Sequence, residues 1–273
     1  MAYKPLFISS NLFLQQLKRK YGARSGGFSG TLDPFAKGCL IVAFGQYTKL
    51  FRFLAKTPKR YRATLWLGAE SCTLDLEKIT RIERVQRQEI GAINDAFAAQ
   101  TGEIWQVPPK YSALRIDGQR SYKLALSGAD YELQKRTITV HSLEMISYAH
   151  PFITFECSVS EGCYVRSIGR DIAAHLGVSG SLSFLERINE GRLVFDHEKP
   201  LNPIGFIDLP RNRYFGDDND ILNGKKAILD GLENRSDGVY LIKCSDFFAI
   251  ISIENCRIKY LQGHLPCPTN EQD

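Results

Sequence analysis

One carboxylate stands apart in the first quarter of the chain. Residues 1–69 contain twelve lysines or arginines and a single acid, Asp33; the next acid is Glu70. Asp33 lies in a glycine-rich stretch, residues 26–38, where glycines permit close approach of another backbone or a ligand. Nearby cations favour the charged form of a carboxylate, so we expect Asp33 to be ionised, as nucleophilic catalysis requires. An aspartate before proline is more often a turn residue, and the dipeptide alone favours that interpretation.

Two further side chains could take part in chemistry. Tyr61 falls on the apolar face of an alternating segment, which indicates either a core tyrosine or a ring that stacks on a nucleic-acid base. Arg166 is expected near the start of a helix, where a cation opposes the helix macrodipole. We therefore expect a carboxylate or a phosphate beside Arg166.

The elements expected around these residues mix strands and helices. Strict alternation predicts a strand over 59–68, and apolar residues at helical spacing predict a helix from about 165 to 176. The same patterns predict helices over 11–21, 46–55, 90–102 and 119–126, and strands over 39–44, 136–148 and 152–159. Because strands and helices do not alternate strictly, the pattern favours an α+β fold over a doubly wound sheet.

Charge is distributed unevenly along the 273 residues. The overall net charge of +5 combines +11 over residues 1–69 with −6 over the remainder, which predicts a basic face suited to a polyanion such as nucleic acid. The seven cysteines are scattered and the five histidines form no ligand pair at helical spacing, so we expect reduced thiols and no metal. The first thirty residues have no apolar signal-peptide core, and we expect a cytoplasmic protein.

Prolines and a polar run mark a domain boundary near residue 200. Pro200, Pro203 and Pro210 precede the polar segment 211–223. We therefore predict a main domain over 1–200 and a small β unit over 201–273. Strands of this unit are expected over 238–243, 247–253 and 257–261. Residues 201–273 carry eight basic and eleven acidic residues, so they are not the expected polyanion surface.

Four motifs, taken in order, resemble the TruB family, the bacterial tRNA pseudouridine-55 synthases. They are Gly30-Thr31-Leu32-Asp33-Pro34-x-Ala36-x-Gly38-x-Leu40, Lys59-Arg60-Tyr61, Pro108-Pro109-x-Tyr111-Ser112-Ala113-Leu114 and Gly162-x-Tyr164-Val165-Arg166-Ser167. The opening Lys4-Pro5 with Ser9-Ser10-Asn11 also resembles that family's first motif. The resemblance implies a pseudouridine synthase fold, with a mixed, mostly antiparallel sheet, flanking helices and a PUA-like β appendage over 201–273.

The resemblance also implies the reaction and its residues. Such enzymes break the bond between uracil N1 and ribose C1′, turn the base and rejoin it through C5, with no cofactor. By this likeness Asp33 initiates cleavage, either by attacking the sugar or by removing a C2′ proton. Tyr61 packs on the target base, and Arg166 pairs with the aspartate. Tyr164 and Leu185 line the base pocket. The implied partner is tRNA, whose T-loop uridine must be flipped out, and we expect a monomer with no membrane or obligatory protein partner.

The chain departs from the family pattern in several places, of which Phe28 and Phe7 concern single side chains. Phe28 stands where the family usually has histidine and could stack on RNA, while Phe7 replaces a usual glycine.

Two other functions stay open. They are a non-catalytic tRNA-binding or tRNA-folding protein on this scaffold, and the same chemistry on another RNA, with guide-directed action as one form of it. We also predict phosphate contacts from basic residues of the first segment, namely Lys18, Lys20, Arg24, Lys49, Lys56 and Lys59.

Overall fold

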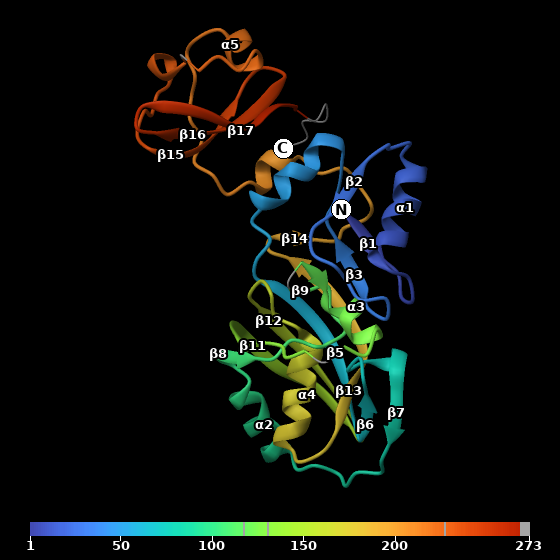
Figure 1. Cartoon of the computed structure of the whole chain (residues 1–273). Coiled ribbons are helices and arrows are strands. Elements are labelled where there is room, and N and C mark those ends of the chain that lie inside the picture. The colour runs from blue at the N-terminus through green and yellow to red at the C-terminus, as the bar shows by residue number, and fades with distance from the viewer. Residues whose placement is uncertain (117, 130, 227, 268–273) are drawn as a thin grey trace. The chain divides into compact units, whose positions relative to one another are not determined.

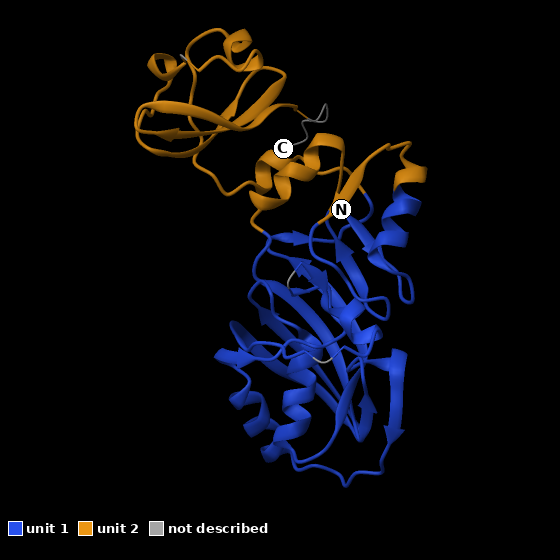
Figure 2. Ribbon diagram, viewed as in Figure 1, with its two compact units in different colours: residues 1–17, 29–41, 56–198 blue, residues 18–28, 42–55, 199–273 orange. Residues whose placement is uncertain are grey.

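The structure of the protein, a computed structural model, describes residues 1–116, 118–129, 131–226 and 228–267 (Figure 1). The chain forms two compact units, coloured separately in Figure 2. The first contains Met1–Leu17, Ser29–Ile41 and Lys56–Glu198, and the second contains Lys18–Phe28, Val42–Ala55 and Lys199–Asp273. These units differ from the predicted ranges 1–200 and 201–273, because two early segments belong to the same compact unit as the C-terminal region.

The first unit is built on one mixed sheet. Its strands run in the order β1 (Ala2–Lys4), β3 (Lys37–Leu40), β13 (Gly180–Glu190), β5 (Lys59–Leu67), β12 (Phe152–Val159), β11 (Arg136–Ala149) and β8 (Gly102–Gln106). The β3–β13 pair is parallel, whereas β1–β3, β13–β5, β5–β12, β12–β11 and β11–β8 are antiparallel. The short β14 (Leu193–Val194) pairs with β13. The expected mixed, mostly antiparallel sheet with flanking helices is thereby confirmed.

Two helices supply the core of this unit. Both α4 (Val165–His175) and α2 (Ile90–Ala99) pack on the sheet (Figure 1). Their apolar side chains join those of β5 and β12 in one buried cluster, which includes Ile93, Phe97, Ile168, Ile172, Leu65 and Phe155. Such burial contributes about 1.5–3 kcal/mol for each large apolar side chain, and it fixes the start of α4, where Arg166 lies.

Two strand predictions for this unit can be compared directly with the elements. The strand predicted over 59–68 is confirmed as β5, in which buried and less buried positions alternate and Tyr61 lies on the buried side. The single strand predicted over 39–44 is wrong. Its first half is β3 and its second half is β4 (Val42–Phe44), which belongs to another sheet, because the chain passes from one unit to the other after Ile41.

Smaller elements complete the first unit. The predicted helix over 119–126 is present from Ser121 as α3 (Ser121–Leu126), after the paired strands β9 (Arg115–Ile116) and β10 (Gln119–Arg120). Strands β6 (Ala69–Ser71) and β7 (Ile79–Ile82) pair around η2 (Leu76–Lys78), and α1 (Ser10–Lys20) follows β1. Within the part of the chain that the structure describes, no helix has the length and apolar character needed to cross a membrane.

The second unit contains the predicted C-terminal strands. They are β15 (Gly238–Lys243), β16 (Phe247–Glu254) and β17 (Arg257–Pro266), paired antiparallel in that order, with α5 (Asp218–Leu222), η3 (Pro203–Phe206) and η4 (Leu229–Gly231). The early segments contribute β2 (Gly26–Phe28), paired with β4, and the 3₁₀ helix η1 (Gly45–Arg52) where an α-helix over 46–55 was predicted. In this unit Leu50 of η1 packs in a core with Phe248, and Arg52 donates a 2.8 Å hydrogen bond to the Leu261 carbonyl.

Candidate active site

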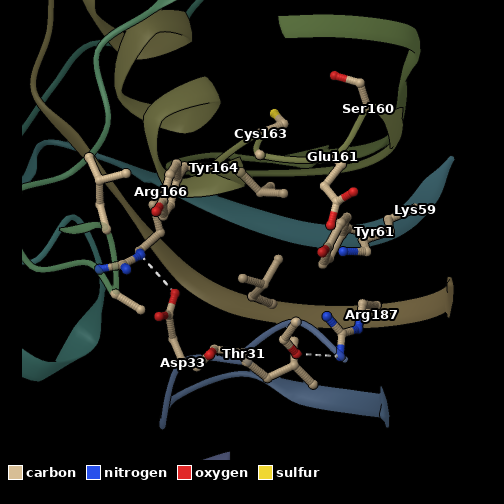
Figure 3. Close-up of a pocket in the computed structure, with 17 residues that line it drawn as sticks. Thr31, Asp33, Lys59, Tyr61, Ser160, Glu161, Cys163, Tyr164, Arg166 and Arg187 are labelled. Carbon is tan, nitrogen blue, oxygen red and sulfur yellow. Dashed lines mark hydrogen bonds and ion pairs between the residues drawn. The ribbon is translucent and has the colours of Figure 1, made fainter. Parts of the chain in front are cut away.

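A cavity of about 300 Å³ opens in the first unit beside the glycine-rich loop (Figure 3). Figure 3 shows Asp33 with Arg166 at one end of it, and Tyr61 with Lys59 and Arg187 at the other. The loop before α4, Leu185 of β13 and the Ala113–Leu114 segment contribute to the rest of the wall. The lining residues are Gly30–Asp33, Lys59, Tyr61, Ala113, Leu114, Ser160–Arg166, Leu185 and Arg187.

Asp33 is presented by a loop that is held at both ends. On one side the buried Ser10 hydroxyl donates to the Leu32 carbonyl at 2.8 Å and accepts from the Leu32 N–H at 3.0 Å. On the other side the Ala36 N–H donates to the Asp33 carbonyl at 3.0 Å, which closes a turn, so the predicted turn is present. The fully buried Lys4 ammonium donates to the Pro34 carbonyl at 3.3 Å. The carboxyl group, about a third exposed, therefore faces the cavity from a fixed backbone.

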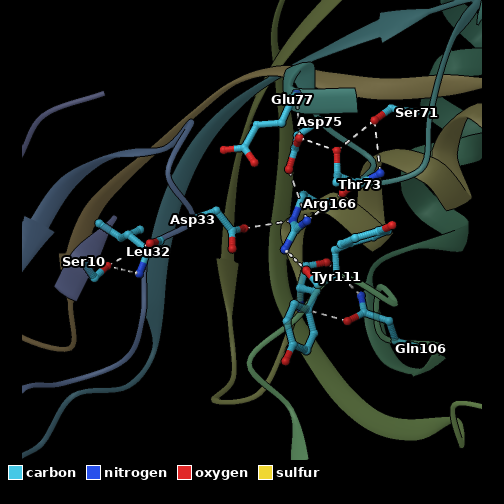
Figure 4. A network of polar contacts seen from close by, with 11 residues as sticks. Ser10, Leu32, Asp33, Ser71, Thr73, Asp75, Glu77, Gln106, Tyr111 and Arg166 are labelled. Atoms are coloured by element: carbon cyan, nitrogen blue, oxygen red, sulfur yellow. Dashed lines mark hydrogen bonds and ion pairs between the residues drawn. The ribbon is translucent and has the colours of Figure 1, made fainter. Parts of the chain in front are cut away.

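Arg166 provides the partner expected for Asp33. Its Nε lies 2.9 Å from Asp33 Oδ2, and its side chain is only 3% exposed (Figure 4). Nη1 lies 3.2 Å from Asp75 Oδ2 and donates to the Thr73 carbonyl at 2.6 Å, while Nη2 donates to the Tyr111 carbonyl at 2.9 Å. With carboxylates and carbonyls on several sides, the guanidinium has a single defined orientation, and it fixes one oxygen of Asp33.

The pKa of Asp33 is subject to opposing influences, whereas its position in the sequence suggested only cations around it. Burial raises the pKa of the Asp33 carboxyl above its ordinary value, the Asp75 carboxylate raises it further, and Arg166 and Lys4 act in the opposite direction. Burial likewise lowers the pKa of Lys4 to about 8. The net result is a carboxyl with a raised pKa, held beside a cation, an arrangement typical of reactive acids.

Tyr61 lies in a second ionic cluster formed with β13. Its side chain is 9% exposed, and burial raises the pKa of its hydroxyl, which interacts with the Arg187 guanidinium. Arg187 is 1% exposed, donates to the Cys39 carbonyl at 2.9 Å and pairs with the buried Glu190 at 2.8 Å. The Lys59 ammonium lies 4.0 Å from Glu190, and burial lowers the pKa of Lys59. The phenol is thus a neutral group with a fixed orientation at the cavity wall.

Comparison with known proteins decides the family. The model of the TruB family pseudouridylate synthase N-terminal domain matches residues 18–165, more than half of the chain. The chain is 48% identical to a protein of Campylobacter curvus named tRNA pseudouridine synthase B, over 95% of both chains, and 46% identical to one of that name in Nitratiruptor, over 97% of both. The protein belongs to the TruB family. It is therefore a pseudouridine synthase by family, and the resemblance seen in the four motifs is confirmed.

Solved structures agree with this family fold. A chain of a Cbf5–Nop10–Gar1 complex matches with a TM-score of 0.65 over 97% of this chain and 82% of that chain, at 18% identity. A chain of an H/ACA ribonucleoprotein bound to a substrate RNA matches with a TM-score of 0.63 over 98% and 84%, also at 18% identity. At such identities the likeness concerns the fold, which is that of pseudouridine synthases.

The structure of this TruB-family chain brings most of the predicted site residues to the cavity. Leu185 is 5% exposed in its wall, and the half-buried Tyr164 ring lies there with the Arg136 guanidinium 4.9 Å from its centroid. Phe28 belongs to β2 of the second unit and is not among the described lining residues.

The predicted phosphate contacts divide between the two units. Four of them, Lys18, Lys20, Arg24 and Lys49, belong to the second unit. In the first unit, Lys56 lies 3.2 Å from Glu161, and Lys59 is a buried residue of the cavity wall rather than a surface cation.

Two ionic residues of the site, Asp75 and Arg187, were missed from the sequence. Asp75 is 2% exposed and accepts from the Thr73 hydroxyl at 2.6 Å and from the Glu77 N–H at 2.9 Å, while its other oxygen faces Arg166. The sequence contains one weak signal for it, an aspartate in an otherwise apolar and hydroxyl-rich segment. For Arg187 the signal was its position two residues after Leu185, a predicted pocket residue. Residues two apart share a face in a regular strand, so this spacing is informative only where a strand has been predicted.

Proposed function

We propose that this protein converts a uridine of tRNA, the T-loop uridine at position 55, to pseudouridine. The observation that carries the proposal is the Asp33–Arg166 ion pair of 2.9 Å in a cavity that Tyr61 also lines. It is supported by 46–48% identity, over 95–98% of the chain, to proteins named tRNA pseudouridine synthase B.

The reaction asks three things of the cavity, and the named residues suit each. The N1–C1′ bond must break, and the ionised Asp33 carboxylate can attack C1′ or remove a C2′ proton. Arg166 holds that carboxylate in one orientation, which supplies the positioning part of catalysis. The freed uracil must turn without leaving, and the Tyr61 ring offers an aromatic face for it.

The closing steps balance without any added group. A C5–C1′ bond forms, the proton lost from C5 is matched by one gained at N1, and the product is an isomer of the substrate. The neutral Tyr61 phenol, oriented by Arg187, lies where it can relay the C5 proton. The walls formed by Leu185 and Tyr164 exclude water from the detached base.

A cavity of about 300 Å³ requires the nucleotide to leave its stack. The volume lies at the lower end of the range for small-ligand pockets and accommodates one nucleoside, not a paired base within a helix. The target uridine must therefore be flipped out, at a cost of a few kcal/mol, which contacts to the base and to the flanking phosphates offset. The predicted cations Lys18, Lys20, Arg24, Lys49 and Lys56 are proposed to supply the phosphate contacts. Phe28 is proposed to contact the RNA by stacking.

The same proposal covers the setting of the enzyme. We expect it to act in the cytoplasm as a monomer, with tRNA as its partner and without a membrane, an obligatory protein partner or a cofactor. Residues 201–273 are proposed to act as a PUA-like appendage to the catalytic region within 1–200.

The test is product formation by the purified chain with a T-stem-loop RNA in the presence of a metal chelator. We expect one pseudouridine at the T-loop position, and with Asp33→Asn we expect RNA binding without product. Asp230→Asn, at a side chain 97% exposed in the second unit, is the matched control and should turn over normally. Retained turnover in Asp33→Asn would falsify the proposal. Binding by the wild-type protein without product would favour a tRNA-folding protein, and product only in another RNA would favour a different substrate.

A further inference from the structure

Phe7 is exposed to solvent and has an unfavourable backbone conformation. Its φ is +61°, in the left-handed region that side chains with a Cβ rarely adopt, and the residue is 73% exposed. Glycine occupies that region without steric cost. A large aromatic side chain at this position therefore works against the stability of the fold.

The conformation is imposed by a network tied to the catalytic loop. The Phe7 N–H donates to the Pro34 carbonyl at 2.7 Å, and Pro34 directly follows Asp33. The fully buried Lys4 ammonium donates to the same carbonyl at 3.3 Å and to the Ile8 carbonyl at 2.7 Å. Phe7 thus projects from a loop whose backbone is fixed to the segment that carries the reactive carboxylate.

The fold makes little use of the Phe7 ring. Across the described residues, the three buried apolar clusters and their packed neighbours do not include it. Two apolar side chains before and after it are also exposed: the adjacent Leu6 at 37%, and Leu12, five residues further along in α1, at 56%. Neither backbone preference nor packing accounts for a phenylalanine here, and its exposed ring is accessible to a partner outside the chain.

The chemistry around Phe7 favours RNA as that partner. A nucleotide whose sugar reaches Asp33 brings its neighbours past Pro34, one hydrogen bond from Phe7. Residues 1–32 contain no aspartate or glutamate that would repel a phosphate backbone. A solvent-facing aromatic ring on a fixed backbone is the usual platform for an unpaired base, because stacking needs only the face of the base.

We propose that Phe7 stacks on an unpaired base of the substrate RNA next to the target uridine and thereby positions that uridine over Asp33. Phe7 is a positioning residue: it touches the RNA but not the reacting atoms. The inference rests on the proposed function for the identity of the RNA, whereas the contact itself is measured by binding.

The experiment compares Phe7→Gly, Phe7→Leu and Phe7→Trp with wild type, in affinity for the T-stem-loop RNA and in the thermal unfolding midpoint. Loss of one stacked base should weaken RNA binding about tenfold in Phe7→Gly and in Phe7→Leu, and Phe7→Trp should restore it. Phe7→Gly relieves the left-handed strain, so its unfolding midpoint should be no lower than that of wild type. A purely structural role for the ring would lower the midpoint instead.

A matched control and a second RNA series locate the contact. Trp105→Leu removes an aromatic side chain that is 70% exposed on β8, the edge strand opposite to β1, and should leave RNA affinity unchanged. The second series consists of RNAs that each lack one base of the loop. We expect one of them, with the base missing at a position other than the target, to bind wild type and Phe7→Gly with equal affinity.

Two results would overturn the inference. One is unchanged RNA affinity in Phe7→Gly, which would assign the ring to a protein or another ligand. The other is a difference between the two proteins that persists at every abasic position. Failure of the proposed function is separate, because it appears as an absence of pseudouridine in the wild-type reaction.

Discussion

Asp75→Asn is the sharpest perturbation of the site, because it removes one charge behind Arg166 and leaves Asp33 in place. The Asp75 carboxylate lies 3.2 Å from Arg166 and raises the pKa of Asp33. Like charges disfavour each other's ionised forms, so removing this one lowers the pKa of Asp33. The acid limb of the pH profile for single-turnover pseudouridine formation should therefore move to lower pH.

The stability of the Asp75→Asn variant and its maximal rate should both fall. Breaking a buried ion pair costs about 3–5 kcal/mol when the remaining charge has no other partner. Here Arg166 keeps Asp33 and two carbonyls, and the amide oxygen of the introduced asparagine can still accept from the Thr73 hydroxyl. We expect a loss of about 2 kcal/mol, equal to roughly 4–8 °C in the unfolding midpoint. A less restrained Arg166 misplaces Asp33, and the maximal rate should fall about tenfold to a hundredfold.

The assay needs both readouts on the same protein. Single-turnover product formation measured across a range of pH gives the acid limb of the pH profile. Calorimetry or circular dichroism gives the thermal unfolding midpoint. Glu70→Gln, which removes an exposed carboxylate from the neighbouring β6, is the control and should leave both readouts unchanged. An acid limb that stays fixed or moves to higher pH in Asp75→Asn would refute the electrostatic argument.

Three further outcomes follow from the same geometry. Tyr61→Phe keeps the ring but removes the hydroxyl that interacts with Arg187, so single-turnover product formation should fall about a hundredfold or more while RNA affinity changes little; an unchanged rate would remove the phenol from the mechanism. Gly38→Ala should cost about 2–3 kcal/mol in chemical denaturation, because its Cβ would lie 2.6 Å from the Arg187 backbone nitrogen, whereas Gly22→Ala, with open space around it, should cost about 1 kcal/mol. Burial raises the pKa of Asp33, so the folded state binds this proton more tightly than the unfolded state does. Wild-type stability should therefore fall as the pH rises from the ordinary carboxyl pKa through the raised pKa of Asp33. The stability of Asp33→Asn relative to wild type should therefore increase across that interval, and a constant difference would contradict the raised pKa.

Elements with regular periodicity were predictable from the sequence. The alternation in 59–67 correctly placed Tyr61 on the buried face, and the helical spacing after Val165 correctly placed Arg166 at a helix start. A cation at that position favours a carboxylate or phosphate partner, and the Asp33 carboxylate, which the family resemblance implied as that partner, lies 2.9 Å away. Local physics was sufficient to place Tyr61 and Arg166 because each of these two conclusions depended on neighbours in the same element.

The central strand β13 was not predicted, although it lies between β5 and β3. Its pairing with β5 shifts register between Leu182 and Phe184 and again between Arg187 and Asn189. Each irregularity changes which residues share a face, so the alternation that reveals a strand is interrupted twice in eleven residues. The pairing is regular from Leu185 to Arg187, but the two-residue spacing assigns both side chains to one face only once the strand itself has been recognised.

The basic character of residues 1–69 has a different meaning in the folded chain than in the sequence. Six of the twelve cations, from Lys18 to Arg24 together with Lys49 and Arg52, belong to the second unit, and the other six belong to the first. Of those in the first unit, Lys4 and Lys59 are buried, and Arg60 and Arg62 both pair with Glu156. The pKa of Asp33 is set first by burial, then by Arg166 and Asp75, which lie 133 and 42 residues away in the chain, and to a smaller degree by Lys4. A count of charges along the sequence therefore indicates the class of partner, whereas the state of the reactive carboxylate depends on its burial and on the side chains that the tertiary fold brings to it.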